Sequence, residues 1–320
     1  MIRQLLLLGT LVATPGLAQE APAFEYGPTT TIDAGSDRQL RMTVPVTVDG
    51  KGPYPFVVDT GADRTVVSRE LATHLKLAPS GTATMHTMAG VGPVNTVRVT
   101  TLTVGGGTNV DIKAPALPRE HLGAHGLLGV DSLQGRRVIM DFRKGTFEVA
   151  DSKIREVREP DTIVVTARSR FGQLVLVDSD IGGTPITVVI DSGAQNSIGN
   201  LALRRMLAKR KKVRNFVPTV MTDVTGATIA AELALVDNIR IGGFTINDVA
   251  VAFVDAHPFK RFELLNKPAM LLGMDTLRAF RRVSVDFAQK KVRFLLPDSS
   301  GLPNQRQWFA FRSQDRASPL

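Results

Sequence analysis

Apolar and polar residues alternate in short runs along most of the chain, and glycine or aspartate separates the runs. Residues 41–48 alternate in this way, turn at 49–52 and continue as the apolar segment 54–58. A period of two is typical of a strand with one buried face, and a short Gly-containing turn joins two such strands into a hairpin. Helices are predicted only as short elements, chiefly at 68–75 and 201–212. The pattern therefore predicts a mainly β protein.

The same order of segments recurs in the second half of the chain. Residues 173–177 form an apolar run, Gly182 and Gly183 make a turn, and the apolar segment 186–190 follows. Each hairpin delivers an aspartate at the end of its second strand. Nine residues separate Gly50 from Asp59, and nine separate Gly182 from Asp191. The equal spacing indicates an internal repeat.

Three further blocks recur downstream in the same order: a Gly-Gly hairpin, a Leu-Leu-Gly segment followed by a short helix, and a closing hairpin. The matching pairs are 102–106 with 239–243, 126–133 with 270–277, and 138–149 with 283–294. Four blocks in one order indicate two homologous lobes. We place the lobes at 36–151 and 162–297, the polar linker at 152–161 and a C-terminal tail at 298–320. The tail carries Trp308, and we expect it to pack on a lobe rather than to bind a partner.

The start of the chain has the order of a secretory signal peptide. Arg3 precedes the apolar run 5–13, and the small residues Gly16 and Ala18 stand before Gln19. About nine apolar residues are too few to span a bilayer, and a buried N-terminal helix is the alternative. We expect a signal peptide at 1–18, an N-terminal extension at 19–35, and a periplasmic or secreted protein without a membrane helix.

The composition agrees with a soluble globular protein of two domains. The 320 residues are 43% hydrophobic and 22% charged, and cysteine is absent. The absence of cysteine excludes disulfides, thiol nucleophiles, Cys-ligated metals and a lipid anchor on cysteine.

The repeated aspartates stand in the sequences Asp59-Thr-Gly-Ala62 and Asp191-Ser-Gly-Ala194. One such motif is typical of a turn after a strand, but two at matching positions predict a catalytic pair. Two adjacent carboxyl groups cannot both ionise easily, so they share one proton. The ionised group can then activate water while the protonated group binds a carbonyl oxygen. Residues expected to support the pair are Thr60, Gly61, Ala62, Ser192, Gly193 and Ala194.

These motifs resemble those of the retropepsin-like and pepsin-like aspartic proteases, from about Gln39 to Leu296. The stretch Val58-Asp-Thr-Gly-Ala-Asp-Arg-Thr-Val66 is similar to the retroviral form, and both copies lie in one chain, as in pepsin. The resemblance implies a mainly β fold of two homologous acid-protease β-barrel lobes related by a pseudo-twofold axis, with short helices. It implies an aspartic endopeptidase with Asp59 and Asp191 as its catalytic pair.

The resemblance also indicates two flaps and an asymmetric cleft. No tyrosine stands in either candidate flap, so the retropepsin flap is the better analogue. The flaps are expected at 88–93 and 223–227. The first motif continues with Asp63 where the second has Gln195, so contacts with a peptide differ between the lobes. The candidate substrate and flap residues are Asp63, Gly90, Gly92, Thr225 and Gly226.

Other acidic and basic residues receive structural assignments. We expect Asp131 and Asp275 to be helix N-caps, and Asp141 and Asp286 to be turn or solvent residues. The spacing of His121 and His125 does not predict a metal site, because no zincin-type Glu follows and the second half has no counterpart. No metal or other cofactor is expected.

Residues 204–214 hold seven basic side chains and account for most of the net charge of +9. The run is interpreted as a solvated helix face, with peripheral contact with an anionic membrane surface as the functional alternative. Nucleic acid is not expected as a partner, because aromatic residues make up only 6% and no reader motif is present. The expected partner is a peptide or protein substrate, and the expected active form is a monomer. The rival function is a non-catalytic peptide-binding or scaffolding protein.

Overall fold

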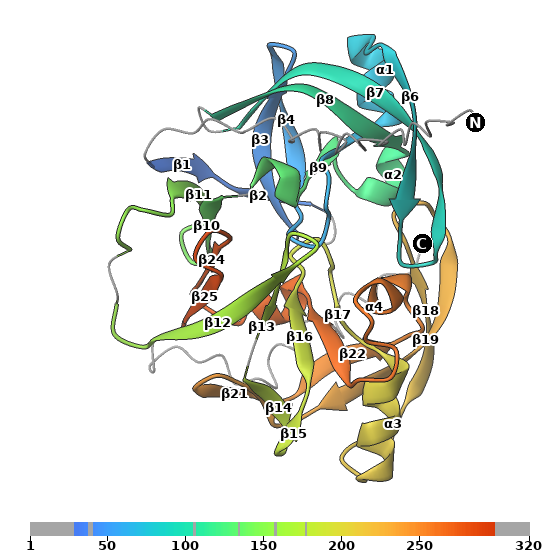
Figure 1. Ribbon diagram of the computed structural model, residues 1–320, viewed down its shortest axis with the longest axis vertical. Coiled ribbons are helices and arrows are strands. Elements are labelled where there is room, and N and C mark those ends of the chain that lie inside the picture. The colour runs from blue at the N-terminus through green and yellow to red at the C-terminus, as the bar shows by residue number, and fades with distance from the viewer. Residues whose placement is uncertain are drawn as a thin grey trace, which may run out of the picture.

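The computed structural model describes residues 29–37, 41–104, 107–133, 135–156, 159–176 and 178–297. Strands dominate these residues and gather into an upper and a lower lobe (Figure 1). The prediction of a mainly β, two-lobed fold is confirmed. The predicted signal peptide at 1–18, the first part of the predicted extension and the tail at 298–320 lie outside the described residues.

The first lobe is built on one eight-stranded sheet. Val66–Ser68 and Lys51–Val58 both pair with the Leu-Leu-Gly strand, which places the end of the aspartate-bearing strand inside the lobe. In spatial order the strands are β2 (Gly35–Ser36), β3 (Met42–Val48), β4 (Lys51–Val58), β9 (Gly126–Leu128), β5 (Val66–Ser68), β8 (Gly107–Leu117), β7 (Val91–Val104) and β6 (Pro79–His86).

The second lobe repeats this plan with shorter strands. Its aspartate-bearing strand again runs parallel to the Leu-Leu-Gly strand. The strands in spatial order are β13 (Gln173–Leu176), β16 (Thr187–Ile190), β23 (Ala269–Leu272), β17 (Ser197–Gly199), β22 (Val249–Phe253), β19 (Thr228–Val236) and β18 (Val217–Thr222). A four-stranded sheet lies beneath, in the order β15 (Thr184–Pro185), β14 (Ser179–Ile181), β20 (Ile239–Ile241) and β21 (Phe244–Ile246).

The two closing hairpins meet in a sheet that both lobes share, on the left of Figure 1. The junction is antiparallel, with Val138 opposite Val285 and Met140 opposite Val283. The strands are β1 (Thr29–Asp33), β11 (Thr146–Asp151), β10 (Arg136–Asp141), β24 (Arg282–Asp286), β25 (Lys291–Leu295) and β12 (Thr162–Arg170). The later part of β12 leaves this sheet and pairs with β13 of the second lobe. The lobes are therefore joined by a continuous hydrogen-bonded sheet as well as by the chain.

Helices are short and sit at strand ends. The Oγ of Ser68 accepts a hydrogen bond from Leu71 N at the start of α1, and the Oδ1 of Asn200 accepts one from Leu203 N at the start of α3. The α3 helix ends at Lys209, three residues before the predicted end. The helices are α1 (Arg69–Leu75), α2 (Arg119–Leu122), α3 (Leu201–Lys209), α4 (His257–Arg261), α5 (Met274–Leu277) and the 3-10 turn η1 (Val130–Ser132).

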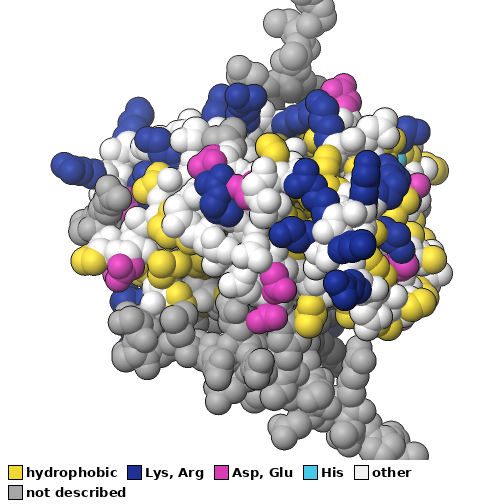
Figure 2. Space-filling view, turned by 90° about the horizontal axis from the view of Figure 1, so that it is seen from below, with side chains coloured by type: hydrophobic (Ala, Val, Ile, Leu, Met, Phe, Trp, Pro, Cys, Tyr) yellow, Lys and Arg dark blue, Asp and Glu magenta, His cyan; other side chains and the backbone are white. Residues whose placement is uncertain are grey.

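The basic run 204–214 covers the exposed side of α3 and the residues after it. Arg204 is engaged with Glu232, with 2.8 Å between Nε and Oε2, and its guanidinium lies over the ring of Phe216. The other six cations of the run are exposed. Figure 2 looks onto this end of the molecule and shows many Lys and Arg side chains there.

The closing hairpins decide between the two roles expected for Asp141 and Asp286, turn or solvent residues. Asp141 and Asp286 accept hydrogen bonds from N–H groups of their turns, as expected, but they are 2% and 0% exposed and so are not solvent residues. Asp286 also accepts a hydrogen bond from the Oγ of Ser152 in the linker. The carboxylate therefore ties the linker to the shared sheet, a contact between residues 134 positions apart that local sequence does not reveal.

Aromatic side chains fix the second lobe to the shared sheet. The ring of Phe294 on β25 is fully buried and lies 5.1 Å from the ring of Phe244 and 4.8 Å from that of Phe280, between centroids. Such contacts add to the free energy gained by burying the rings.

We predict that Phe294→Ala lowers the free energy of unfolding by about 3–5 kcal/mol, because it leaves a cavity among the three rings. Val164→Ala on the neighbouring strand β12 is the control, since Val164 is exposed and the expected change is within about 0.5 kcal/mol. Chemical denaturation of both variants measures the difference, and equal losses would contradict the assigned packing.

Candidate active site

Asp59 and Asp191 stand at matching positions, one residue beyond the ends of β4 and β16. The N–H of Asp59 donates to the carbonyl of Leu128 at 3.0 Å, and that of Asp191 donates to the carbonyl of Leu272 at 3.1 Å. Both acceptors belong to the Leu-Leu-Gly strands. Apolar strands with strong β propensity therefore carry each carboxyl group into the interior between the lobes.

The residues after the two aspartates bind each other across the lobe boundary. The N–H of Thr60 donates to the Oγ of Ser192 at 3.1 Å, and the N–H of Ser192 donates to the Oγ1 of Thr60 at 3.0 Å. Each hydroxyl in turn donates to the carbonyl before the opposite aspartate, Ile190 at 3.1 Å and Val58 at 2.8 Å. Both hydroxyl residues are buried, so these four bonds are shielded from water and hold the loops in one register.

The glycines allow each carboxyl group to reach the opposite loop. A Cβ atom on Gly193 would lie 2.1–2.3 Å from the carboxyl atoms of Asp59, and one on Gly61 would lie 2.5–2.8 Å from those of Asp191. No side chain fits at either place. Each glycine also donates its N–H to its own aspartate, at 2.9 Å from Gly61 to Asp59 and 3.1 Å from Gly193 to Asp191. Ala194 N adds a second bond to Asp191 at 3.1 Å.

Burial raises the pKa of both carboxyl groups. At Asp59 the positive charge of Arg41 and backbone N–H groups oppose this effect without cancelling it. At Asp191 the negative charge of Asp59 adds to burial, and together they raise the pKa of Asp191 to about 7. The two carboxyl groups therefore titrate separately, and the pair retains a proton on Asp191 up to about pH 7, as expected for two carboxyl groups in one buried place.

Asp131 and Asp275 are not N-caps, which corrects the expectation from the sequence. Gly129 and Gly273 occupy the cap positions, and the two aspartates stand in the first turn. The Oδ1 of Asp131 accepts a hydrogen bond from the Thr65 hydroxyl at 2.8 Å, and that of Asp275 accepts one from the Ser197 hydroxyl at 2.8 Å. The two carboxylates thus fasten the segments that follow the Asp-Thr/Ser-Gly loops.

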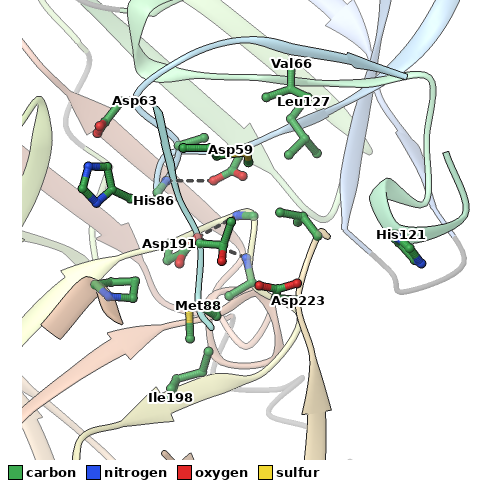
Figure 3. A pocket seen from close by; sticks show the side chains of 18 of the residues that line it. Asp59, Asp63, Val66, His86, Met88, His121, Leu127, Asp191, Ile198 and Asp223 are labelled. Atoms are coloured by element: carbon green, nitrogen blue, oxygen red, sulfur yellow. Dashed lines mark hydrogen bonds between the residues drawn. The ribbon is translucent and has the colours of Figure 1, made fainter. Parts of the chain in front are cut away.

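A cavity of about 480 Å³ opens above the two aspartates. In Figure 3 Asp59 and Asp191 lie at its centre, with Val66 and Leu127 on the side of the first lobe and Ile198 on the side of the second. The lining is mixed: apolar side chains such as Val66, Leu127 and Ile198 alternate with about as many polar and charged ones, which suits a ligand with both apolar and hydrogen-bonding groups.

Two hairpins contribute to the lining of this cavity, β6–β7 from the first lobe and β18–β19 from the second, and both lie on the right of Figure 1. The N–H of Ala89 donates to Asp223 Oδ2 at 3.3 Å, and the N–H of His257 donates to the carbonyl of Met88 at 3.0 Å. The rings of His86 and His257 are stacked, with 2.9 Å between Nδ1 and Nε2. The first hairpin is therefore closed onto the second lobe.

The second hairpin is closed onto the first lobe. A Cβ atom on Gly226 would lie 2.5 Å from the ring of His121, so a larger residue does not fit there. The φ angle of Gly226 is +87°, a conformation that also favours glycine. The N–H and Oγ1 of Thr225 donate to Asp223 Oδ1 at 2.8 and 2.6 Å and shape the turn. Although burial acts in the opposite direction, hydrogen bonds from Thr225 and Thr87 lower the pKa of Asp223 and keep it ionised.

The predicted residues fall into two groups. The lining of the cavity includes Asp59, Gly61, Ala62, Asp63, Asp191, Gly193 and Ala194. Thr60 and Ser192 lie beneath it, and Gly90, Gly92, Thr225 and Gly226 belong to the hairpins without lining it. The hairpin residues that line it include Met88, Asp223 and Val224 of the predicted flap segments, and also the strand residues Met85 and Thr222.

The cleft is asymmetric at Asp63, which forms an ion pair with Arg261 of α4. The guanidinium of Arg261 lies 4.6 Å from the ring centroid of Phe171. The matching residue of the second loop is Gln195, which is uncharged. One end of the cavity thus carries a fixed ion pair and the other an amide.

Sequence reasoning missed several residues of the site: Arg41, Arg261, His86 and His257. Arg41 had a detectable signal, because it stands 18 residues before Asp59 as Gln173 stands 18 before Asp191. The others pair across lobes, and no local pattern reveals their partners.

The described part of the chain carries neither a cluster of metal-ligating side chains nor a helix suited to a membrane. No group of three or more His, Asp or Glu side chains there could hold a metal ion. Within the same residues, no helix has the length and apolar character needed to cross a membrane.

Comparison with protein families finds one match in each lobe. Residues 44–135 match the family described as "gag-polyprotein putative aspartyl protease", and residues 177–276 match the family described as "Aspartyl protease". A search of curated proteins finds no match.

We predict that Asp191→Asn removes a pH-dependent loss of stability. A carboxyl group whose pKa is raised from 3.8 to about 7 by folding stabilises the folded state below about pH 4, and this contribution is lost as the pH rises to about 7. The loss amounts to at most a few kcal/mol, since each pKa unit is worth about 1.4 kcal/mol.

Melting temperatures between pH 4 and 8 test this. The wild type should lose stability relative to Asp191→Asn as the pH rises, and the exposed control Asp111→Asn should keep the wild-type slope. Parallel profiles for wild type and Asp191→Asn would contradict the raised pKa.

Proposed function

Because the chain belongs to the aspartyl protease family, with one domain of that family in each lobe, we propose that it is an aspartic endopeptidase. Its substrate is a peptide or protein segment bound in the cavity beneath the two hairpins. Asp59 and Asp191 act as one catalytic pair on a bound water and need no cofactor.

The observation that carries this proposal is the reciprocal binding of the two loops. Four buried hydrogen bonds join the loops that contain Thr60 and Ser192. Asp59 also lies close to Gly193, and Asp191 lies close to Gly61, so the two carboxyl groups come together in one place. A structural pair of acids would not need the cavity above it. The preorganised site instead favours general acid–base catalysis, in which the groups need no rearrangement during reaction.

The mechanism follows from the shared proton. Asp59, as the carboxylate, takes a proton from water while the water oxygen bonds to the peptide carbonyl carbon. Asp191, as the acid, gives its proton to the carbonyl oxygen, which forms a gem-diol. The C–N bond then breaks as the proton on Asp59 passes to the leaving nitrogen, and a diol hydroxyl returns a proton to Asp191. Every proton is restored, and no covalent enzyme intermediate forms.

We predict that Asp59→Asn lowers peptide cleavage by about 10³-fold or more, because the amide cannot accept the water proton. Fold should persist, since the amide matches the carboxyl group in shape. Mass spectrometry of a peptide library at pH 4 to 7 measures cleavage, and Asp111→Asn, an exposed exchange of the same type, is the matched control.

Full activity of Asp59→Asn would contradict the mechanism. Binding of peptides by the wild type without cleavage at any pH would favour the rival function of a non-catalytic peptide-binding protein.

We also propose that the protein acts in the periplasm or outside the cell, on the basis of the charged, apolar and small-residue order of residues 1–18. N-terminal sequencing of the protein recovered from the exported fraction should start at Gln19. A protein that retains Met1 and stays inside the cell would contradict export.

A further inference from the structure

Arg41 borders the cavity that holds the catalytic pair and is almost completely buried. Its side chain is 4% exposed and that of its partner Asp37 is 1% exposed, with 2.6 Å between Nη2 and Oδ2. The Nε of Arg41 also donates to Asp37 at 2.8 Å, and Nη2 donates to the carbonyl of Leu122. The fork of the guanidinium is thus held at several points, and its charge is shielded from water.

The remaining nitrogen reaches the opposite lobe. Arg41 Nη1 donates to the carbonyl of Gly193 at 3.1 Å, in the loop that carries Asp191. Gln173 makes the matching contact, since its Nε2 donates to the carbonyl of Gly61 in the loop that carries Asp59. Both residues precede the aspartate of their own lobe by 18 positions. The two contacts are therefore equivalent in the repeat, but only one of the two donors is charged.

We propose that Arg41 is a positioning residue that also supplies a positive charge to the catalytic pair from the first lobe, whereas Gln173 supplies the same loop contact without charge. The cation favours the ionised form of both carboxyl groups, and it comes from the first lobe only, because the matching donor of the second lobe is the neutral Gln173. The two lobes therefore contribute unlike halves to one site, and the pH range of activity depends on Arg41.

The other charged groups around the cavity do not replace this effect. Asp63 is paired with Arg261, and Asp223 is held by the turn of its own hairpin. Burial is the largest influence on both catalytic carboxyl groups, and among side-chain charges Arg41 alone acts on both to lower the pKa. The charged and titratable residues that face the pair or its cavity are Asp37, Arg41, Asp63, Arg64, His86, His121, Asp223 and Arg261.

The test compares three changes. Arg41→Gln makes the two lobes alike and removes the charge. Both limbs of the pH–activity profile should therefore move to higher pH by about one pH unit, the lower end of the shift that a nearby opposite charge causes. Arg41→Lys keeps the charge and should leave the limbs in place while lowering kcat through the lost fork. Gln173→Leu removes the neutral contact and should lower kcat without moving the limbs.

A second variant guards against misfolding, because Arg41→Gln leaves the buried Asp37 without its cation. The double variant Asp37→Asn with Arg41→Gln removes both charges and should show the same upward shift. Unmoved limbs in a folded Arg41→Gln or double variant would overturn the inference, as would an equal shift in Gln173→Leu.

The inference rests on the proposed function, so one readout is independent of activity. The dependence of the melting temperature on pH reports the titration of the pair without substrate. The pH-dependent fall in stability that Asp191→Asn abolishes should occur about one pH unit higher in the double variant Asp37→Asn with Arg41→Gln. Absence of cleavage by the wild type would refute the proposed function alone. An unshifted melting profile would refute the role of Arg41 alone.

Discussion

Two carboxyl groups buried at the same point would repel each other if both were ionised, and the rest of the site depends on how this cost is met. One shared proton removes the repulsion, and backbone N–H groups of Gly61, Gly193 and Ala194 stabilise the remaining charge. The bonds between Thr60 and Ser192 then keep the carboxyl groups from moving apart. The geometry that makes the pair chemically useful is also the geometry that makes its burial tolerable.

The same requirement explains the architecture around the loops. Each loop is supported from below by a Leu-Leu-Gly strand and fastened behind by Asp131 or Asp275, so neither can relax independently. The closing hairpins place Val138 and Val285 opposite each other in the shared sheet, which fixes the lobes at the face away from the flaps. With the base and the pair held in this way, the proposed function requires the two hairpins to move apart from the opposite lobe to admit a peptide.

The repeat made much of this predictable from sequence. Matching spacing located Asp59 and Asp191 together, because a duplicated lobe must present equivalent residues at its boundary. Local rules were insufficient where a carboxylate has a partner far away in the sequence. Local sequence suggests a helix cap at Asp131, which instead accepts a hydrogen bond from Thr65, and a turn residue at Asp286, which also accepts one from Ser152. Arg261 and His257 gave no signal for the same reason, since their partners lie in the other lobe.

The fusion of two lobes in one chain has a consequence for the polarity of the substrate. A site made from two identical chains has a true twofold axis, so a peptide meets the same surroundings whether it lies in one direction or the reverse. Here the Asp63–Arg261 ion pair stands at one end of the cleft and Gln195 at the other. A peptide has distinct amino and carboxyl ends, and in this cleft its two orientations differ in energy. Under the proposed function, a peptide substrate therefore has one preferred direction in the cleft.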